Sequence, residues 1–376
     1  MILGMSEQAG PERGAKLKRR GYAIGAGGLA LLAVFAVVIA SRTDPSSLGG
    51  PGRRVDPENL AVGKPVPSLR NAGDWLNSPP LSSSDLAGKV VVYDFWTYSC
   101  VNCVRTLPYL RSWWDRYQAD GLVIVGVHSP EFEFEKKRPN VEAAVARLGV
   151  TWPVTMDNSM AVWDDFSNNW WPAKYVADRD GRLRYQHIGE GGYGETEDVL
   201  RSLLGVDRAS PRAAAPGTAA PVDPDAAAKQ NISAETYLGV LRGFAGTKSG
   251  VQSYPEPGMI VAGESRLVGT WDGANERVTS ASDGPSAILM QYRAREVNLV
   301  MSADAPTDVV VELDGKPVPA GSRGADVVAD PSGATVVRVD RSDMYRLVLG
   351  PSVEDHLLRL TVRGKGLSGY AFTFGA

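Results

Sequence analysis

"DFWTYSCVNCVRTLPYL" (residues 94–110) contains the only two cysteines of the chain, Cys100 and Cys103, which stand three positions apart. The run before them, "VVVYDFW", is rich in β-forming residues, whereas "CVRTLPYL" has apolar positions at helical spacing. The pair therefore lies where a strand passes into a helix. Backbone amides and the helix dipole at that point favour a thiolate, so Cys100 is expected to attack and to leave. Cys103, one turn further on, would resolve the mixed disulfide.

Three other interpretations of the cysteine pair are weaker. A structural disulfide closing so short a loop would contribute only about 2 kcal/mol. A zinc site needs four ligands, and no metal is predicted because the histidines show no ligand spacing. A peroxide-reducing thiol is a minor alternative: Thr97 has the spacing such enzymes use, but Tyr93 replaces the expected proline. The three histidines are His128, His187 and His356.

The residues around the cysteine motif predict an α/β domain over residues 60–204. "KVVVYDFW" and "GLVIVGVH" are typical of buried strands. "CVRTLPYLRSWWDRYQAD" and "NVEAAVARLG" carry the period of amphipathic helices. Strands that alternate with helices indicate a layered α/β structure.

This region resembles the thioredoxin superfamily, on the residues "YDFWTYSCVNC", the helix proline Pro108 and the later "WWPAKYVADRDGRLRY". "LNSPPLSSSDLAGKVVVYDFWTYSCVNC" and "GEGGYGETE" are similar to the TlpA-like group, and most closely to the extracytoplasmic half of DipZ-type proteins. The likeness covers residues 63–204. Cys103 and Pro172 are 69 positions apart, so we expect a thioredoxin-like fold with an inserted strand-helix unit at "GLVIVGVHSPEFEFEKKRPNVEAAVARLG".

The resemblance also implies roles for individual residues. It makes the Trp171–Pro172 bond cis and opposite the cysteines, where an ordinary trans turn is the alternative. Such a bond leaves the preceding backbone free to pair with a substrate strand. Asp94 would move protons for Cys103, unless it is a salt-bridged structural acid. The residues expected at the substrate groove are Val101, Asn102, Trp171 and Trp96, of which Trp96 could equally be a packed aromatic.

Two further groups near the motif carry weaker expectations. The glutamates of "EFEFE", at positions 131, 133 and 135, suit a solvated loop as well as a second proton acceptor. His128 ends a strand and is expected to be a packed residue, so it is not a candidate site residue.

The N-terminal region predicts a membrane anchor. Residues 21–40 are 20 residues without a charge, long enough to cross the bilayer as a helix. The basic residues of the 1–20 tail keep that tail in the cytoplasm, and the rest of the chain is expected on the extracytoplasmic side. A signal peptide cleaved before Ser41 is the alternative. Residues 41–59, rich in Gly, Pro and Ser, suit a tether.

After residue 204 the composition changes twice. Residues 205–230 are rich in Ala and Pro, which indicates a linker. Residues 231–376 read as a short helix at "SAETYLGVLRGFAG" followed by separate strands, among them "SAILMQYRA" and "EVNLVMSA", with a hairpin signal at Asp314-Gly315. They predict an antiparallel, jelly-roll-like sandwich, similar in architecture to carbohydrate-binding modules. Three aromatic residues could either stack on glycans or pack in the core of this sandwich: Trp271, Tyr292 and Tyr370.

The predicted function is that of a membrane-anchored thiol-disulfide oxidoreductase that needs no cofactor. The resemblance suggests a reductant of disulfide-bearing envelope proteins, with apocytochrome c among the candidate clients. A single span without cysteine cannot carry electrons, so a CcdA- or DsbD-type membrane protein is the expected donor. The alternative is a binding or scaffold protein acting through the sandwich. With 40 basic and 43 acidic residues, the chain has no global field to attract nucleic acid.

Overall fold

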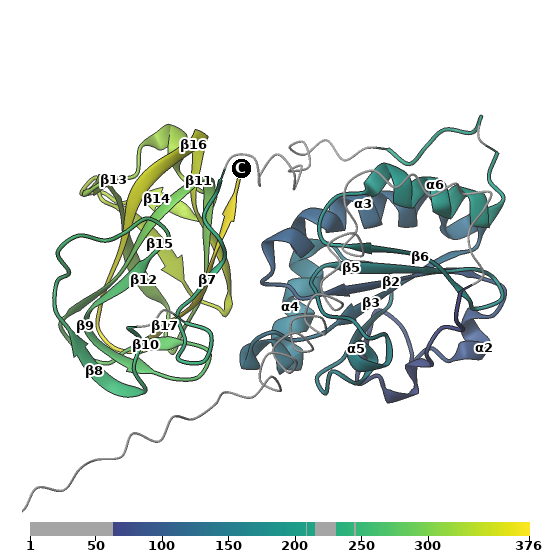
Figure 1. The fold of residues 1–376 in the computed structure, drawn as a ribbon, viewed down its shortest axis with the longest axis horizontal. Helices are drawn as coiled ribbons and strands as arrows, with labels where there is room; N and C mark the ends of the chain where they lie inside the picture. Colours follow the sequence, from purple (N-terminus) through teal and green to yellow (C-terminus); the bar gives the residue numbers. More distant parts are fainter. Residues whose placement is uncertain (1–62, 208, 215–230, 244–245) are drawn as a thin grey trace, which may run out of the picture. The chain divides into compact units, whose positions relative to one another are not determined.

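The computed structural model describes residues 63–207, 209–214, 231–243 and 246–376 (Figure 1). The predicted basic tail, membrane anchor and tether lie outside the described residues, as does most of the predicted linker. Among the residues described, no helix is both long and apolar enough to cross a membrane.

The first part, up to residue 207, is built on a six-stranded sheet with the order β1-β4-β3-β2-β5-β6. Strands β2, β3 and β4 are parallel, and β5 and β6 continue the sheet antiparallel to them. The elements are η3 (Leu69–Asn71), β1 (Trp75–Leu76), α2 (Ser83–Leu86), β2 (Val90–Trp96), α3 (Val101–Tyr117), η4 (Gln118–Asp120), β3 (Leu122–His128), η5 (Glu133–Lys136), α4 (Arg138–Leu148), β4 (Val154–Met156), α5 (Ala161–Asp165), β5 (Ala173–Ala177), β6 (Leu183–Ile188) and α6 (Tyr193–Leu204).

Helices cover both faces of this sheet, as Figure 1 shows for α3 and α6 on one side and α5 on the other. Strand β2 is buried throughout, and its alternate side chains enter two different cores. Val90, Val92 and Trp96 pack with α3, α4 and α6, whereas Tyr93 and Phe95 pack with α5. These layers confirm the predicted thioredoxin-like α/β fold, and β3 with α4 forms the expected strand-helix unit.

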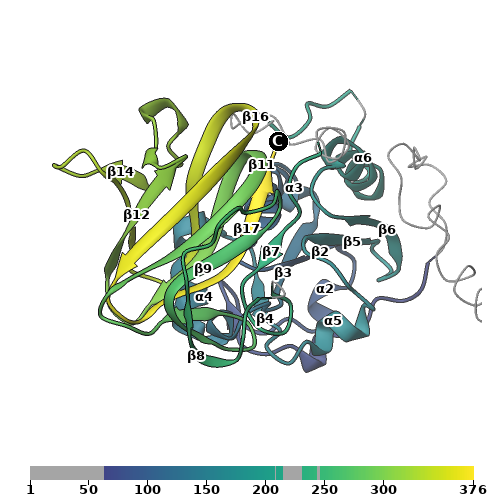
Figure 2. The ribbon, with the colours of Figure 1, turned by 60° about the vertical axis from the view of Figure 1, so that its left-hand side comes forward.

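The second part, from residue 231, is a β structure whose strands pair antiparallel in one continuous network. Its long strands β11, β16 and β17 run side by side (Figure 2). The elements are β7 (Thr236–Tyr237), β8 (Gly250–Tyr254), β9 (Ser265–Gly273), β10 (Val278–Ser280), β11 (Pro285–Ala303), β12 (Thr307–Leu313), β13 (Lys316–Pro317), η6 (Ala320–Ser322), β14 (Val327–Ala329), β15 (Thr335–Val339), β16 (Asp343–Arg363) and β17 (Leu367–Gly375).

Two expectations for this part are wrong. Residues 233–243 do not form a helix, because β7 adds as a strand to β17, pairing Tyr237 with Ala371. The runs predicted as separate strands on either side of residue 295 form one strand, β11, with a bulge between Ala294 and Glu296. Its first half pairs with β9 and its second half with β17.

The predicted hairpin at Asp314-Gly315 is confirmed. It joins β12 to β13, and both turn residues have positive φ, 52° at Asp314 and 73° at Gly315. A two-residue turn of this kind requires that conformation at both positions, which Asp and Gly tolerate better than other residues.

The three aromatic residues proposed for glycan stacking are buried. Trp271 and Tyr292 are fully buried in the core of the second part. Tyr370 instead packs on the first part, with its ring 5.2 Å from that of Phe132 and 4.9 Å from that of Phe134. The core alternative is therefore the correct one for Trp271 and Tyr292, and none of the three can offer an exposed stacking platform.

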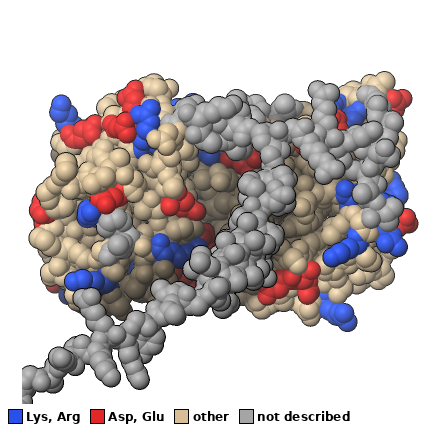
Figure 3. Space-filling view, in the orientation of Figure 1, with Lys and Arg blue, Asp and Glu red and all other residues tan. Residues whose placement is uncertain are grey.

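Ion pairs accompany the aromatic contact between the two parts. Arg105 of α3 binds Glu296 of β11 at 2.5 Å, and Arg147 of α4 binds the buried Asp343 of β16 at 2.6 Å. On the face drawn in Figure 3, basic and acidic side chains of the described residues are interspersed.

Candidate active site

The two cysteines occupy unequal environments at the start of α3. Cys100 is the N-cap residue, and its Sγ accepts a hydrogen bond from the backbone N–H of Cys103 at 3.3 Å. Cys100 is half-buried, whereas Cys103 is only 1% exposed, and both are free thiols. Burial raises the pKa of the Cys103 thiol well above its usual value, and the hydrogen bond and charge of Cys100 raise it further. One sulfur is thus accessible and the other is shielded and held protonated.

Asp94 is buried on the same face of β2 as the residues that pack under α3. Burial raises the pKa of its carboxyl to about 7, against a smaller lowering by Lys174. Its Oδ1 has no hydrogen-bond partner among the described residues. The charge of Asp94 in turn raises the pKa of Cys103. This is the environment of a group that can take up and release a proton near neutral pH.

Lys174 is a site residue that the sequence analysis did not identify as a candidate. It stands directly opposite Asp94 in the antiparallel pairing of β2 with β5 and is fully buried. Burial lowers the pKa of Lys174, and the charges of Asp94 and Cys103 oppose that effect. Its Nζ donates to the carbonyl of Gly189 at 3.3 Å. The available signal was a lysine inside the apolar strand "AKYVA", where a charge is costly unless another charge compensates it.

Replacing Lys174 should therefore change how Asp94 titrates. In Lys174→Met the nearby positive charge is lost, so we expect the pKa of Asp94 to rise above about 7. The measurement is a pH titration of the Asp94 carboxyl carbon by NMR in the reduced protein. Lys89→Met, at an exposed position before β2, is the matched control and should leave the pKa of Asp94 unchanged. An unchanged or lowered Asp94 pKa in Lys174→Met would contradict the assignment.

The Trp171–Pro172 peptide bond is cis, as the family resemblance implies, and the alternative of an ordinary trans turn is wrong. Pro172 leads directly into β5, so it lies next to the strand that carries Lys174. The indole N–H of Trp171 donates to the carbonyl of Ser129 at 3.0 Å, and its ring lies 4.3 Å from that of Trp163. These contacts hold the Trp171 side chain in a defined position.

A cavity of about 220 Å³ lies directly at Cys100. Cys100, Val101, Asn102 and Trp171 line it from the first part, so the structure brings together three of the four residues expected at the substrate groove. The opposite side is lined by residues of strands β7, β11 and β17 of the second part. We call this space the active-site cleft.

Trp96, the fourth expected groove residue, does not line the cleft. It is 1% exposed, and its ring lies edge-on to His128 at 5.4 Å. The packed-aromatic alternative is thus the correct one. His128 is likewise a packed residue, as expected: it stacks on Tyr98, and burial lowers its pKa to about 3. Nε2 of His128 lies 3.4 Å from the hydroxyl of Thr97, so the threonine of the peroxidase alternative is buried beside this ring.

The glutamates after β3 differ in their environments. Glu135 is fully buried, accepts a hydrogen bond from the Ser99 hydroxyl at 2.6 Å, and has a pKa raised by burial to about 7. Glu131 accepts from the hydroxyl of Tyr237 at 2.6 Å and pairs with Arg242 at 2.9 Å. Of the three, only Glu133 is exposed; it begins η5 and pairs with Lys136. Glu135 therefore supports the segment just before Cys100.

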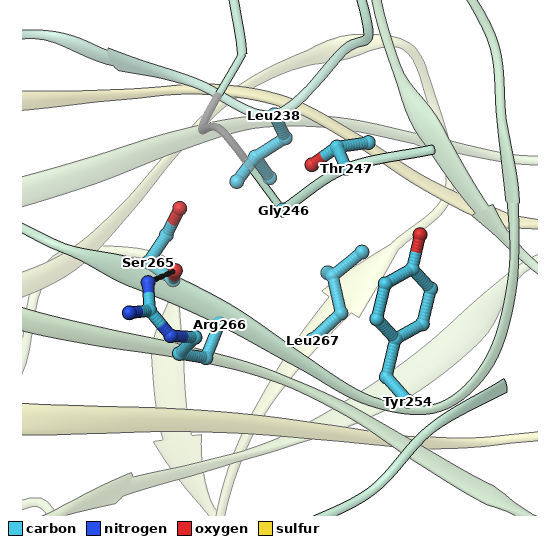
Figure 4. Close-up of a pocket in the computed structure, with 7 residues that line it drawn as sticks. All are labelled: Leu238, Gly246, Thr247, Tyr254, Ser265, Arg266 and Leu267. Atoms are coloured by element: carbon cyan, nitrogen blue, oxygen red, sulfur yellow. Dashed lines mark hydrogen bonds between the residues drawn. The ribbon is translucent and has the colours of Figure 1, made fainter. Parts of the chain in front are cut away.

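A second hollow, of about 320 Å³, lies within the second part (Figure 4). Tyr254 and Leu267 face it, and Arg266 donates to the carbonyl of Ser265 at 3.0 Å. It contains no cysteine, so it is not part of the redox site. In the described part of the chain, no group of three or more His, Cys, Asp or Glu residues is placed to hold a metal ion.

The chain matches two protein families. Residues 61–204 match the Redoxin family, and residues 233–375 match the family described as the thioredoxin-like C-terminal domain. Protein DipZ of Mycobacterium tuberculosis is 34% identical over 319 residues, which are 82% of this chain and 43% of DipZ. The chain thus spans less than half the length of that relative.

Shorter relatives match the first part alone. The thiol-disulfide oxidoreductase YkuV of Bacillus subtilis is 33% identical over 145 residues, which are 39% of this chain and 97% of YkuV. A solution structure of a thioredoxin-like protein in its oxidized form is 32% identical and covers 39% of this chain and 98% of its own, with a TM-score of 0.35. Together with the cysteine pair at the start of α3, the Redoxin match and the similarity to YkuV place the chain in the thioredoxin-like family of thiol-disulfide oxidoreductases.

Proposed function

We propose that this protein is a membrane-anchored, extracytoplasmic enzyme that reduces or isomerises disulfides in envelope proteins through Cys100 and Cys103. The observation that carries the proposal is the inequality of the two sulfurs. The accessible Cys100 caps a helix, while the buried Cys103 lies one turn away with its N–H on the Cys100 sulfur. A thiolate at a helix N-terminus is a good nucleophile and a good leaving group.

The reaction takes place in two exchanges. The Cys100 thiolate attacks one sulfur of a client disulfide; a Cys100–client disulfide forms, and the other client sulfur leaves and takes up a proton. Asp94 then accepts the Cys103 proton, and the Cys103 thiolate attacks Sγ of Cys100. The second client sulfur leaves as a thiolate and takes up a proton, and a Cys100–Cys103 disulfide remains. Two electrons have passed from the enzyme to the client.

The proposal also covers the direction of electron transfer, the client protein and the electron donor. A reducing enzyme must be recharged, and a CcdA- or DsbD-type membrane protein is the proposed donor. Apocytochrome c is a proposed client among disulfide-bearing envelope proteins. Residues 21–40 would hold the enzyme at the membrane with its catalytic part outside the cytoplasm. Glycan binding by the second part stays a prediction to which no aromatic platform can be assigned, since Trp271, Tyr292 and Tyr370 are buried.

The competing proposal is a scaffold acting through the second part, and it gives no reason for a pair of unequal thiols near a buried acid. Replacing Cys103 by Ser should distinguish the enzyme from the scaffold. Without the resolving sulfur, the Cys100–client bond cannot be released, so we expect mixed disulfides to accumulate up to one client per enzyme. Cells expressing Cys103→Ser are acid-quenched and alkylated, and the complexes are compared on non-reducing gels.

The matched control is the double variant Cys100→Ser/Cys103→Ser, which retains the fold but has no attacking sulfur. It should capture nothing. Equal capture by both variants, or capture by neither while the protein is folded and reduced, would favour the scaffold. The captured proteins would name the clients, and the donor as well if it is trapped.

A further inference from the structure

The second part forms one wall of the active-site cleft. Tyr237 of β7, Val300 of β11, and Thr373 and Phe374 of β17 line the cleft across from Cys100. Aromatic contacts from Tyr370 to Phe132 and Phe134 and the Arg105–Glu296 ion pair connect that wall to the first part. A client that reaches the Cys100 sulfur must therefore touch residues of both parts.

The space between the walls is small. Its volume of about 220 Å³ is below the range of roughly 300–1,000 Å³ that is usual for small-molecule sites. Side chains of both parts border it, which favours a slender segment over a flat, folded protein surface. A single extended segment of polypeptide, with its cysteine side chain directed at Cys100, fits this shape.

Thr373 contributes a hydroxyl that lacks a hydrogen-bond partner among the described residues. The residue is 8% exposed, and its Oγ1 is buried without a hydrogen-bond partner among the residues that the structure describes. An unpaired buried hydroxyl costs free energy, and native structures usually pair such groups with another atom. Because Thr373 lines the cleft, a backbone group of a bound client can supply the missing partner.

We propose that the β17 wall is a client-binding subsite, in which Thr373 hydrogen-bonds the backbone of an extended, disulfide-bearing segment while Val300 contacts its side chains. Thr373 is then a specificity-determining residue: it favours flexible polypeptide disulfides over small disulfides that end short of the wall. The inference rests on the proposed function, since it names the substrate class of the same site.

The test compares two substrates in a single turnover of the pre-reduced full chain. One is a short flexible peptide joined to a second copy of itself by a disulfide; the other is bis(2-hydroxyethyl) disulfide. In Thr373→Val, which keeps the shape and removes the hydroxyl, we expect the second-order rate constant for the peptide to fall about three- to tenfold, as for one lost hydrogen bond. The rate constant for the small disulfide should stay unchanged.

Two variants control for damage to the fold. Thr373→Ser keeps a hydroxyl and should retain most of the wild-type preference for the peptide. Thr361→Val makes the same replacement on β16, away from the cleft, and should leave both rates alone. An equal loss for both substrates in Thr373→Val, or no loss for either, would overturn the proposal, as would loss of the peptide preference in Thr361→Val.

Binding separates a failure of this inference from a failure of the proposed function. The affinity of the same peptide with Ser in place of Cys is measured by calorimetry for wild type and Thr373→Val. Weaker binding to the variant supports the subsite even if the enzyme reduces neither substrate. If the enzyme reduces both substrates and the peptide binds wild type and Thr373→Val with the same affinity, the proposed function stands and the proposed subsite is wrong.

Discussion

Cys100→Ser should reduce insulin no faster than dithiothreitol does alone, whereas the wild-type chain should accelerate the reaction. A serine hydroxyl at the same N-cap position keeps a hydrogen-bond acceptor for the Cys103 N–H, so α3 can begin as before. It cannot attack a disulfide at neutral pH or leave from one, because both steps need a thiolate. The loss is expected to be complete because the chain has only one other sulfur nucleophile of this kind, Cys103, and it is buried.

The measurement is the turbidity of precipitating insulin B chain, with circular dichroism to show that the variant is folded. Ser99→Ala is a useful comparison: it changes the neighbouring side chain, which binds Glu135, but leaves both thiols. It should retain activity. Equal rates for wild type and Cys100→Ser would show that the cysteine pair does not perform the reaction, and the scaffold proposal would then account better for the protein.

Asp94→Asn should slow the second exchange and change its pH dependence. Burial raises the pKa of Asp94 to about 7, so the carboxylate that accepts the Cys103 proton becomes populated as the pH rises through that value. In wild type, release of a client from Cys100 should therefore speed up between about pH 6 and pH 8. Asparagine is neutral at every pH and cannot accept the proton. We expect a rate about 100-fold lower at pH 8, at the lower end of what a positioned base contributes.

The experiment starts from a mixed disulfide between Cys100 and a coloured thiol and follows release of that thiol by stopped flow across the pH range. Asp115→Asn, on the exposed side of α3, is the matched control and should keep the wild-type profile. The assignment of Asp94 as the proton acceptor fails if Asp94→Asn retains the rise near pH 7. An unchanged rate at pH 8 would make Asp94 a structural acid instead.

Local sequence determined much of the site. The strand "VVVYDFW" and the helix that follows it meet at Cys100 because hydrophobic period and capping are local properties of the chain. Hence the cysteine pair, its place at a helix N-terminus and the acid below it could all be predicted. The family resemblance added the cis bond before Pro172, which lies far along the chain from the cysteines.

Long-range packing decided what the sequence could not. Residues 233–243 have a helical pattern but form no helix. Thr236 and Tyr237 pair as β7 with β17 instead, because a strand edge more than 100 residues away supplies the backbone partners. Lys174 becomes informative only when the antiparallel register sets it opposite Asp94. Likewise Trp96 was expected at the substrate groove, but the alternation of side chains along β2 places it in the core.

The sequence by itself determined a redox-active helix N-terminus on an α/β sheet, since those features depend on neighbouring residues and their period. Only the tertiary structure decided which surfaces surround the reactive sulfur. Cys100 and Thr373 line one cleft although they are far apart in the chain. The physical reason is that the apolar contacts of Tyr370 with Phe132 and Phe134, which no local pattern encodes, bury the two parts against each other.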